Sequence, residues 1–146
     1  MNRPTFEIRL ADWPTEQSLL RWVREKVFIE EQQVPKELEW DGEDDKAVHV
    51  LALDSDDNPI GTARLLPTGQ IGRMAVLQEW RRRGVGSALL QRLLAEAALS
   101  DYPDLYLNAQ TSALPFYAQL GFQAEGEIFY EADIPHRRMT RTDQNG

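Results

Sequence analysis

The sequence contains no cysteine, only two histidines and no apolar run long enough to cross a membrane. The absence of cysteine excludes disulfides, thiolate catalysis and cysteine-ligated zinc. Since His49 and His136 are the only imidazoles, we expect no metal site. The N-terminal residues do not form a charged segment followed by an apolar run, as a secretory leader does. We therefore expect a cytoplasmic protein that works without a metal.

Negative charge is concentrated in one segment. Residues 30–57 contain eleven Asp or Glu and two Lys, which gives −9, whereas the whole chain carries −8. The chain thus lacks the basic face that nucleic-acid binding needs. Such an acidic segment is either a solvated loop or a field that attracts a cationic substrate. We expect a small, cationic amine as partner, with no nucleic acid and no membrane, and a homodimer remains open.

The length of 146 residues, of which 42% are hydrophobic, suits one globular domain with its own core. We expect this domain to span residues 1–146, with a frayed tail at 142–146. Hydrophobic periodicity predicts a helix that Thr15 caps and that runs to Gln32, and two further helices at 84–99 and 112–121. Strands are predicted at 6–10, 47–53, 60–66, 70–76, 105–109, 122–130 and 136–140, with the second to fourth as an antiparallel meander. The order is β-α-β-β-β-α-β-α-β-β, which indicates a mixed α/β (α+β) fold.

The most informative segment is a basic turn that opens a helix, Arg81-Arg82-Arg83-Gly84-Val85-Gly86-Ser87, just after the strand end Met74-Ala75-Val76. Its glycines allow close approach of the backbone to a ligand. The helix directs free N–H groups and a positive dipole end into the turn, which favours a pyrophosphate. A triphosphate loop would need a lysine after Gly86, and a dinucleotide fingerprint would need glycine in place of Leu89. The alternative is an ordinary basic turn that caps a helix.

This turn resembles the Arg/Gln-x-x-Gly-x-Gly/Ala signature of the GNAT superfamily of N-acetyltransferases, and the element order is similar over nearly the whole chain. Asn108, at a strand end, and the Tyr-x-x-x-Gly-Phe segment from Tyr117 to Phe122 are a second match. Further residues resemble the small bacterial ElaA-like acyltransferases: the segment 27–35, Asp41, Asp44 or Asp45, His49 and the segment 134–139. The resemblance implies a mostly antiparallel sheet flanked by helices, with acetyl-coenzyme A as acyl donor.

The resemblance also implies roles for cofactor-binding residues. The backbone of Met74, Ala75 and Val76 would bind the pantetheine arm, and the turn from Arg81 to Ser87 would bind the pyrophosphate. Tyr117 would lie beside the sulfur, Asn108 would order a water or bond the pantetheine, and Phe116 is a further cofactor-binding candidate. Tyr117 is our choice for the general acid that protonates the departing thiolate. The alternatives are a half-buried aromatic at 117 and an Asn108 that merely ends its strand.

The acceptor side is less defined by the sequence. Arg24, Phe28 and Glu31 fall at i, i+4 and i+7, so we expect them on one helical face that lines the acceptor pocket. The alternative is an exposed Arg–Glu face with Phe28 in the core. His136 is a further candidate for substrate binding. Glu31, His49 or His136 could accept the amine proton, and the sequence does not choose among them.

We therefore predict an N-acetyltransferase in which the acceptor amine attacks acetyl-coenzyme A directly in a ternary complex. Two alternatives remain. One is an enzyme similar to acyl-homoserine-lactone synthases, whose spacing is echoed by Arg24, Phe28, Trp40, Asp41, Asp44 or Asp45, and Arg64, although those enzymes usually lack the glycine turn. The other is a non-catalytic acyl-coenzyme A sensor.

Overall fold

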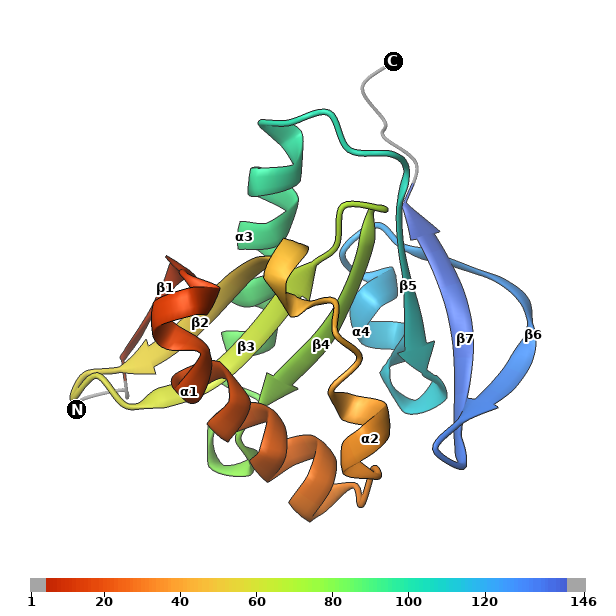
Figure 1. Cartoon of the computed structure of the whole chain (residues 1–146). Coiled ribbons are helices and arrows are strands. Elements are labelled where there is room, and N and C mark those ends of the chain that lie inside the picture. Colours follow the sequence, from red (N-terminus) through yellow and green to blue (C-terminus); the bar gives the residue numbers. More distant parts are fainter. Residues whose placement is uncertain (1–4, 142–146) are drawn as a thin grey trace.

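The computed structural model describes residues 5–141, so the expectation for the tail at 142–146 lies outside the described residues. A seven-stranded sheet has the order β1-β2-β3-β4-β5-β7-β6 (Figure 1). The strands are β1 (Phe6–Ala11), β2 (Val48–Asp54), β3 (Pro59–Leu65), β4 (Gln70–Val76), β5 (Leu105–Gln110), β6 (Gln123–Glu131) and β7 (Ile134–Arg141). The α-helices are α1 (Trp13–Arg24), α2 (Lys36–Glu39), α3 (Val85–Ala98) and α4 (Leu114–Ala118).

All strand pairs are antiparallel except β4 with β5, and β2, β3 and β4 form the predicted meander. Helices α1 and α2 lie in front of the sheet in Figure 1, and α3 and α4 lie behind it. The predicted mixed fold and element order are therefore confirmed. Among residues 5–141, no helix is both long and apolar enough to span a membrane.

The core lies on both faces of the central strands because β2 and β3 are apolar on both faces. Leu51 of β2 packs with Trp13 and Leu20 of α1. Val50, on the other face of the same strand, belongs to the cluster that contains Leu89 of α3. Burying an apolar side chain of this size contributes about 1.5–3 kcal/mol, so β2 ties the two helical layers to the sheet.

The first helix begins earlier than the sequence indicated. We predicted Thr15 as its N-cap, but the helix starts at Trp13 and Asp12 is the N-cap residue. The carboxylate of Glu16 accepts a hydrogen bond from the Asp12 N–H at 3.0 Å, and the Thr15 hydroxyl donates to the Asp12 carboxylate at 2.7 Å. Pro14 suits the first turn, where its missing N–H costs nothing. Thr15 thus supports the cap from inside the helix.

The predicted helix to Gln32 is not a continuous α-helix. After Arg24 the chain forms a π-helix over Glu25–Glu31, in which the Gln32 N–H donates to the Val27 carbonyl at 3.0 Å. Because the wider π turn alters the angle between successive residues, the i, i+4, i+7 spacing no longer defines one face. Arg24 is buried, whereas Glu31 is exposed. The prediction of a single face with Arg24, Phe28 and Glu31 was wrong for this reason.

Strand β4 separates from β5 after only two residues. Parallel pairing is limited to Gln70 with Tyr106 and Ile71 with Leu107. On the other edge of β4 the register with β3 shifts between Thr62 and Arg64, and Arg73 has a φ of 48°, in the left-handed region. Such a bulge bends a strand and increases its local twist. On the edge that faces β5, the backbone of β4 beyond Ile71 therefore borders a gap, whereas its other edge remains paired with β3.

A buried ion-pair network holds the segment between the π-helix and β2 against the sheet. It contains three arginines and three carboxylates: Arg24, Arg64, Arg73, Glu39, Asp41 and Asp44. Asp44 accepts from Arg24 at 2.8 Å and from Arg64 at 2.9 Å. Arg24 is 1% exposed and Glu39 is 3% exposed. Because the formal charges balance, the network can be buried without a net charge.

The network predicts a stability loss in acid. Burial alone would raise the pKa of Asp41, but hydrogen bonds from Arg64 and from the Glu43 N–H, together with nearby arginine charge, lower it to about 2 from 3.8. A carboxyl with a lowered folded-state pKa stabilises the fold above its unfolded pKa and loses that contribution as pH falls through the folded value. Urea unfolding should show the stability advantage of the wild type over Asp41→Asn shrinking between pH 4 and pH 2. Parallel stability curves for the two proteins would contradict this.

Candidate active site

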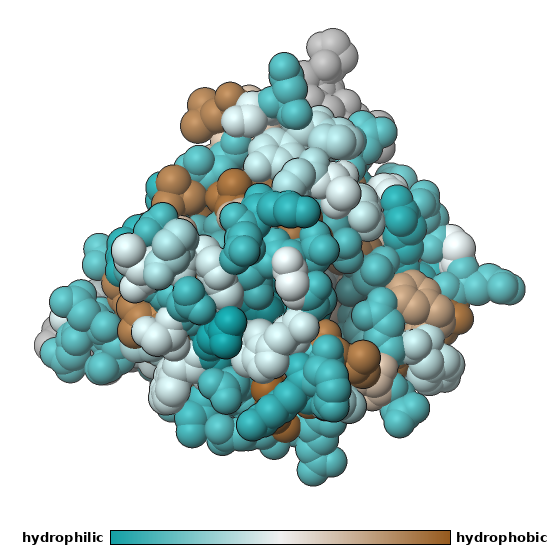
Figure 2. All heavy atoms as spheres, in the orientation of Figure 1, coloured by the Kyte–Doolittle hydropathy of each residue, from teal (hydrophilic) through white to brown (hydrophobic). Residues whose placement is uncertain are grey.

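A cavity of about 490 Å³ opens in the gap between β4 and β5. It is large enough for a small molecule and the end of a cofactor arm. On the face drawn in Figure 2, hydrophobic residues are scattered among hydrophilic ones and form no extended apolar patch. Elements from both halves of the fold line the cavity, including Phe28, Gln32, Leu38, Glu39, Gln70, Arg73, Met74, Asn108, Gln110, Tyr117, Glu131, Ala132 and His136.

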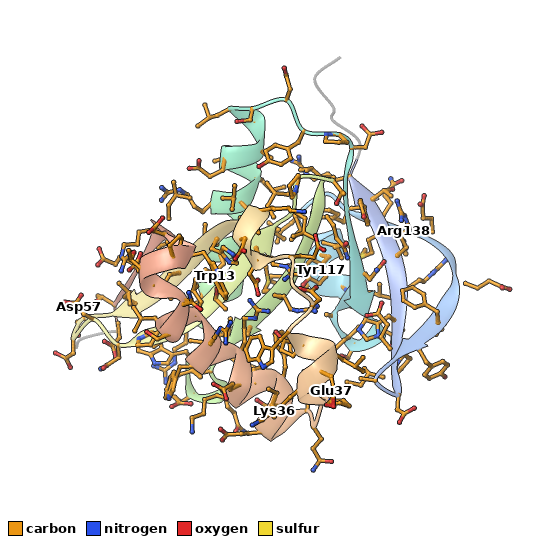
Figure 3. All side chains as sticks on the ribbon, viewed as in Figure 1. Trp13, Lys36, Glu37, Asp57, Tyr117 and Arg138 are labelled. Atoms are coloured by element: carbon orange, nitrogen blue, oxygen red, sulfur yellow. The ribbon has the colours of Figure 1, made fainter. Side chains whose placement is uncertain are left out.

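Tyr117 lies at the gap between β4 and β5, where Figure 3 labels it. Its ring packs edge-on against Phe116 and Phe122, with centroids 5.0 and 6.2 Å away. Its hydroxyl lies 3.7 Å from the Met74 sulfur, which is a weak acceptor. Burial raises the pKa of Tyr117 to about 12. The phenol therefore keeps its proton at neutral pH and makes no strong hydrogen bond to a described residue.

The predicted pyrophosphate turn contains two residues in the left-handed conformation directly before a helix. Arg82 and Gly84 have φ values of 64° and 86°, and α3 begins directly afterwards at Val85. Backbone N–H groups in such a turn converge on a concave site, and the first turn of α3 adds its free N–H groups. A side chain at Gly84 would meet nothing within 4 Å. A Cβ at Gly86 would instead lie 3.4 Å from Phe116, so Gly86 serves close packing between α3 and α4.

Arg81 fixes the start of this turn. Its Nε donates to the Val76 carbonyl at 3.0 Å, and its two terminal nitrogens donate to the two carboxylate oxygens of Glu31, each at 2.6 Å. The guanidinium is thus already paired, whereas Arg82 and Arg83 form no ion pair among residues 5–141. The positive charge available to a phosphate comes mainly from these two residues and from α3.

Two of the three proposed proton acceptors lie outside the cavity. The hydrogen bond from Arg81 lowers the pKa of Glu31, against the opposing effect of burial, so this carboxylate is a weak base. His49 is 2% exposed, stacks on Trp13 at 4.9 Å, and its Nε2 lies 3.0 Å from the Asp44 carbonyl. Burial lowers the pKa of His49. Its ring is neutral and supports the loop that carries Asp44.

Of the residues assigned to the acceptor side, Phe28 and His136 line the cavity and Arg24 does not. Arg24 is buried, and its guanidinium donates hydrogen bonds to Glu39 and Asp44. Four of the residues that echo lactone synthases come together, because Trp40 stacks on Arg24 at 4.9 Å and Asp44 accepts from both Arg24 and Arg64. In this structure their polar groups are bonded to one another.

The structure also adds cavity residues that the sequence did not single out. The Gln110 amide donates to the Gln32 side-chain oxygen at 3.0 Å, which links β5 to the end of the π-helix across the cavity. Arg73 lines the cavity and donates to the carbonyls of Leu38 and Glu39 at 3.2 Å. Gln32 lies within the segment 27–35, but no sequence pattern indicates that its side chain contacts Gln110. Only the folded topology brings these residues together.

The acidic segment at 30–57 does not form one field over the cavity. Glu31 is paired with Arg81, and three more of its carboxylates are paired within the ion-pair network. Figure 3 shows Asp57 at one end of the molecule, well away from Glu37 on α2. The carboxylates that line the cavity are Glu39, which belongs to the network, and Glu131 at the end of β6.

Comparison with known proteins identifies the family and the fold of the chain. An acetyltransferase (GNAT) domain family matches residues 11–142. The uncharacterized N-acetyltransferase YjcF of Bacillus subtilis (strain 168) is 36% identical over 124 residues, which cover 82% of this chain and 88% of that protein.

Two solved structures are similar over nearly their full length. An acyl-CoA N-acyltransferase from Pseudomonas aeruginosa has a TM-score of 0.83 at 31% identity and covers 94% of this chain and 100% of that chain. ElaA of Escherichia coli has a TM-score of 0.83 at 27% identity, with the same coverage of 94% and 100%. The family match covers the gap between β4 and β5, the basic turn and Tyr117. The chain therefore belongs to the GNAT family of acetyltransferases and is an acyl-coenzyme A-dependent acetyltransferase.

Proposed function

We propose that this enzyme transfers the acetyl group of acetyl-coenzyme A to the amine of a small acceptor, by direct attack within a ternary complex. The observation that carries this proposal is the position of Tyr117. A half-buried phenol that keeps its proton faces a cavity at the point where β4 leaves β5. A departing thiolate needs such a proton donor, and a phenol in an apolar site can supply it.

The cofactor would lie along the gap. Its pyrophosphate would bind at the turn from Arg82 to Gly84, where the α3 dipole and the converging N–H groups favour negative charge. Its pantetheine arm would extend between the strands and hydrogen-bond the backbone of β4 beyond Ile71, which has no β5 partner there. A β4 N–H near Met74 could then polarise the thioester carbonyl, as an oxyanion hole does.

The acceptor would enter from the face that carries Phe28, Leu38 and Glu131. Direct attack is favoured because the described lining residues include no cysteine, serine or lysine, which are common acyl carriers. A small primary amine, which is cationic in solution, fits the cavity volume. Support for its positive charge comes from Glu131 rather than from the acidic segment as a whole, most of whose charge near the site is paired.

The assignment of the cofactor turn predicts the effect of Gly84→Asp. The position is open and left-handed, and aspartate tolerates that conformation better than most residues. The fold should therefore survive, while the new carboxylate repels the phosphates, so we expect at least a ~10-fold loss of coenzyme A affinity by calorimetry, corresponding to about 1.4 kcal/mol. Gly126→Asp is a matched control, since Gly126 is also left-handed, with a φ of 75° and open space. Equal affinities for the two variants would contradict the assignment.

The role of Tyr117 predicts a selective loss of rate in Tyr117→Phe. The substitution retains the ring contacts to Phe116 and Phe122 but removes the proton that the thiolate would take. We expect kcat to fall by about 10²-fold, the lower end of general-acid contributions, while the Kd for coenzyme A changes little. The measurement is thiol release under conditions in which chemistry limits turnover. A wild-type kcat under those conditions would exclude Tyr117 as the acid.

A further inference from the structure

The proposed transfer leaves one proton without an assigned destination. The acceptor arrives as an ammonium and must lose a proton before its nitrogen can attack the thioester carbon. The C–N bond then forms and the C–S bond breaks, and Tyr117 gives a proton to the thiolate. The nitrogen loses its second proton as the amide forms, which replaces the one that Tyr117 gave. The first proton therefore requires a separate base at the acceptor side of the cavity.

We propose that His136 is this base and that it accepts the proton at Nε2, an inference that rests on the proposed acetyl transfer. Of the three groups that the sequence offered for the task, His136 alone lines the cavity. Glu31 is held by Arg81 and His49 is buried under Asp44. The position of His136 in the cavity lining is therefore our reason for selecting it among the three candidate bases.

The hydrogen bonding of His136 fixes the required tautomer. Its Nδ1 lies 2.7 Å from the carbonyl oxygen of Ile134. A carbonyl oxygen only accepts, so Nδ1 must carry the hydrogen and the neutral ring has its lone pair on Nε2. Within residues 5–141, no group hydrogen-bonds to Nε2. The ring therefore has its basic nitrogen free and its other nitrogen tied to its own strand.

The sheet fixes the orientation of the ring. His136 lies opposite Gln110 of β5 and opposite Phe129 of β6, and residues directly opposite in antiparallel strands project to the same face. Phe129 stacks on the imidazole with centroids 5.9 Å apart and an interplanar angle of 23°. Gln110, on the other side, is held by Gln32. With 9% of its surface exposed, His136 has little freedom to turn away from the cavity.

Other charged groups around the cavity have different positions or partners. Glu39 of α2 and Arg73 of β4 belong to the ion-pair network. Tyr117 of α4 keeps its proton at neutral pH. Glu131 lies at the end of β6 and is exposed, so it is solvated rather than bound to the ring. These are the titratable and charged groups that line the cavity with His136.

The test is His136→Asn, because an asparagine amide N–H can replace the Nδ1–H donor to Ile134 while Nε2 is removed. With acetyl-coenzyme A and the best acceptor from a panel of small primary amines, we expect kcat/KM at neutral pH to fall by about 10²-fold. The acid limb of its pH profile should disappear, and coenzyme A affinity should stay unchanged. His49→Gln, which retains a donor for the Asp44 carbonyl, should keep the acid limb. A His136→Asn enzyme that retains both rate and limb would overturn the proposal.

A second measurement uses the wild-type protein and needs no acceptor. Long-range ¹H–¹⁵N spectra of the two histidines in the coenzyme A complex should show the neutral ring of His136 with a protonated Nδ1 and an unprotonated Nε2, and His49 with a protonated Nε2. The opposite tautomer at His136 would overturn the proposal even if the variant fails to fold. Failure of the wild type to acetylate any amine, with the expected tautomer present, would count against the proposed function rather than against the state of the ring.

Discussion

The whole site depends on the early separation of β4 from β5. Two paired residues hold the strands together, and the bulge at Arg73 then turns β4 away, so the hydrogen-bonding edge of a central strand faces open space. Unpaired backbone groups inside a fold are costly unless they gain partners. In this position they provide a preformed edge on which an extended, amide-containing molecule can complete the sheet. The cavity, the tyrosine and the histidine are all arranged around that edge.

Arg73 connects this bend to the ion-pair network. Its backbone adopts the left-handed conformation at the bulge, and its side chain reaches Glu39 and Asp41 on the segment that closes the front of the cavity. Buried ion pairs add little net stability compared with apolar packing, because desolvation offsets their attraction. Their effect here is geometric. They specify how the segment from Val34 to Lys46, which has few apolar residues to bury, lies across the sheet.

The sequence predicted the features that depend on local pattern. The pattern of apolar residues and turn residues located all seven strands, and the glycine turn located the start of α3 to within one residue. The sequence failed where a choice between side-chain partners or between backbone hydrogen-bond patterns decides the outcome. Asp12 rather than Thr15 caps α1 because Glu16 reaches back to the Asp12 N–H. The π-helix is not visible in helical periodicity, since an α and a π turn bury similar residues.

The same limit applies to the candidate site. Tyr117 was found because a short motif carries it, and the cavity does contain it. The roles of Glu31 and His49 depended on their hydrogen-bond partners. Glu31 pairs with Arg81, 50 residues away along the chain, and His49 contacts the Asp44 carbonyl, five residues away. The sequence predicted that the acidic segment attracts a cation, because the arginines that neutralise it lie in α1, β3 and β4, outside the segment. The net charge of a sequence segment therefore does not predict the charge that the folded surface presents.

The pair between Glu31 and Arg81 joins the proposed cofactor site to the proposed acceptor site by a single side-chain contact. Glu31 ends the π-helix that carries Phe28 to the cavity, and Arg81 opens the turn beside α3. Coupling between two binding sites is reciprocal, so any change that the cofactor makes in this pair acts equally on the acceptor. An exposed ion pair contributes about 0.2–1 kcal/mol. Through this contact alone, the cooperativity between cofactor and acceptor is therefore limited to about fivefold.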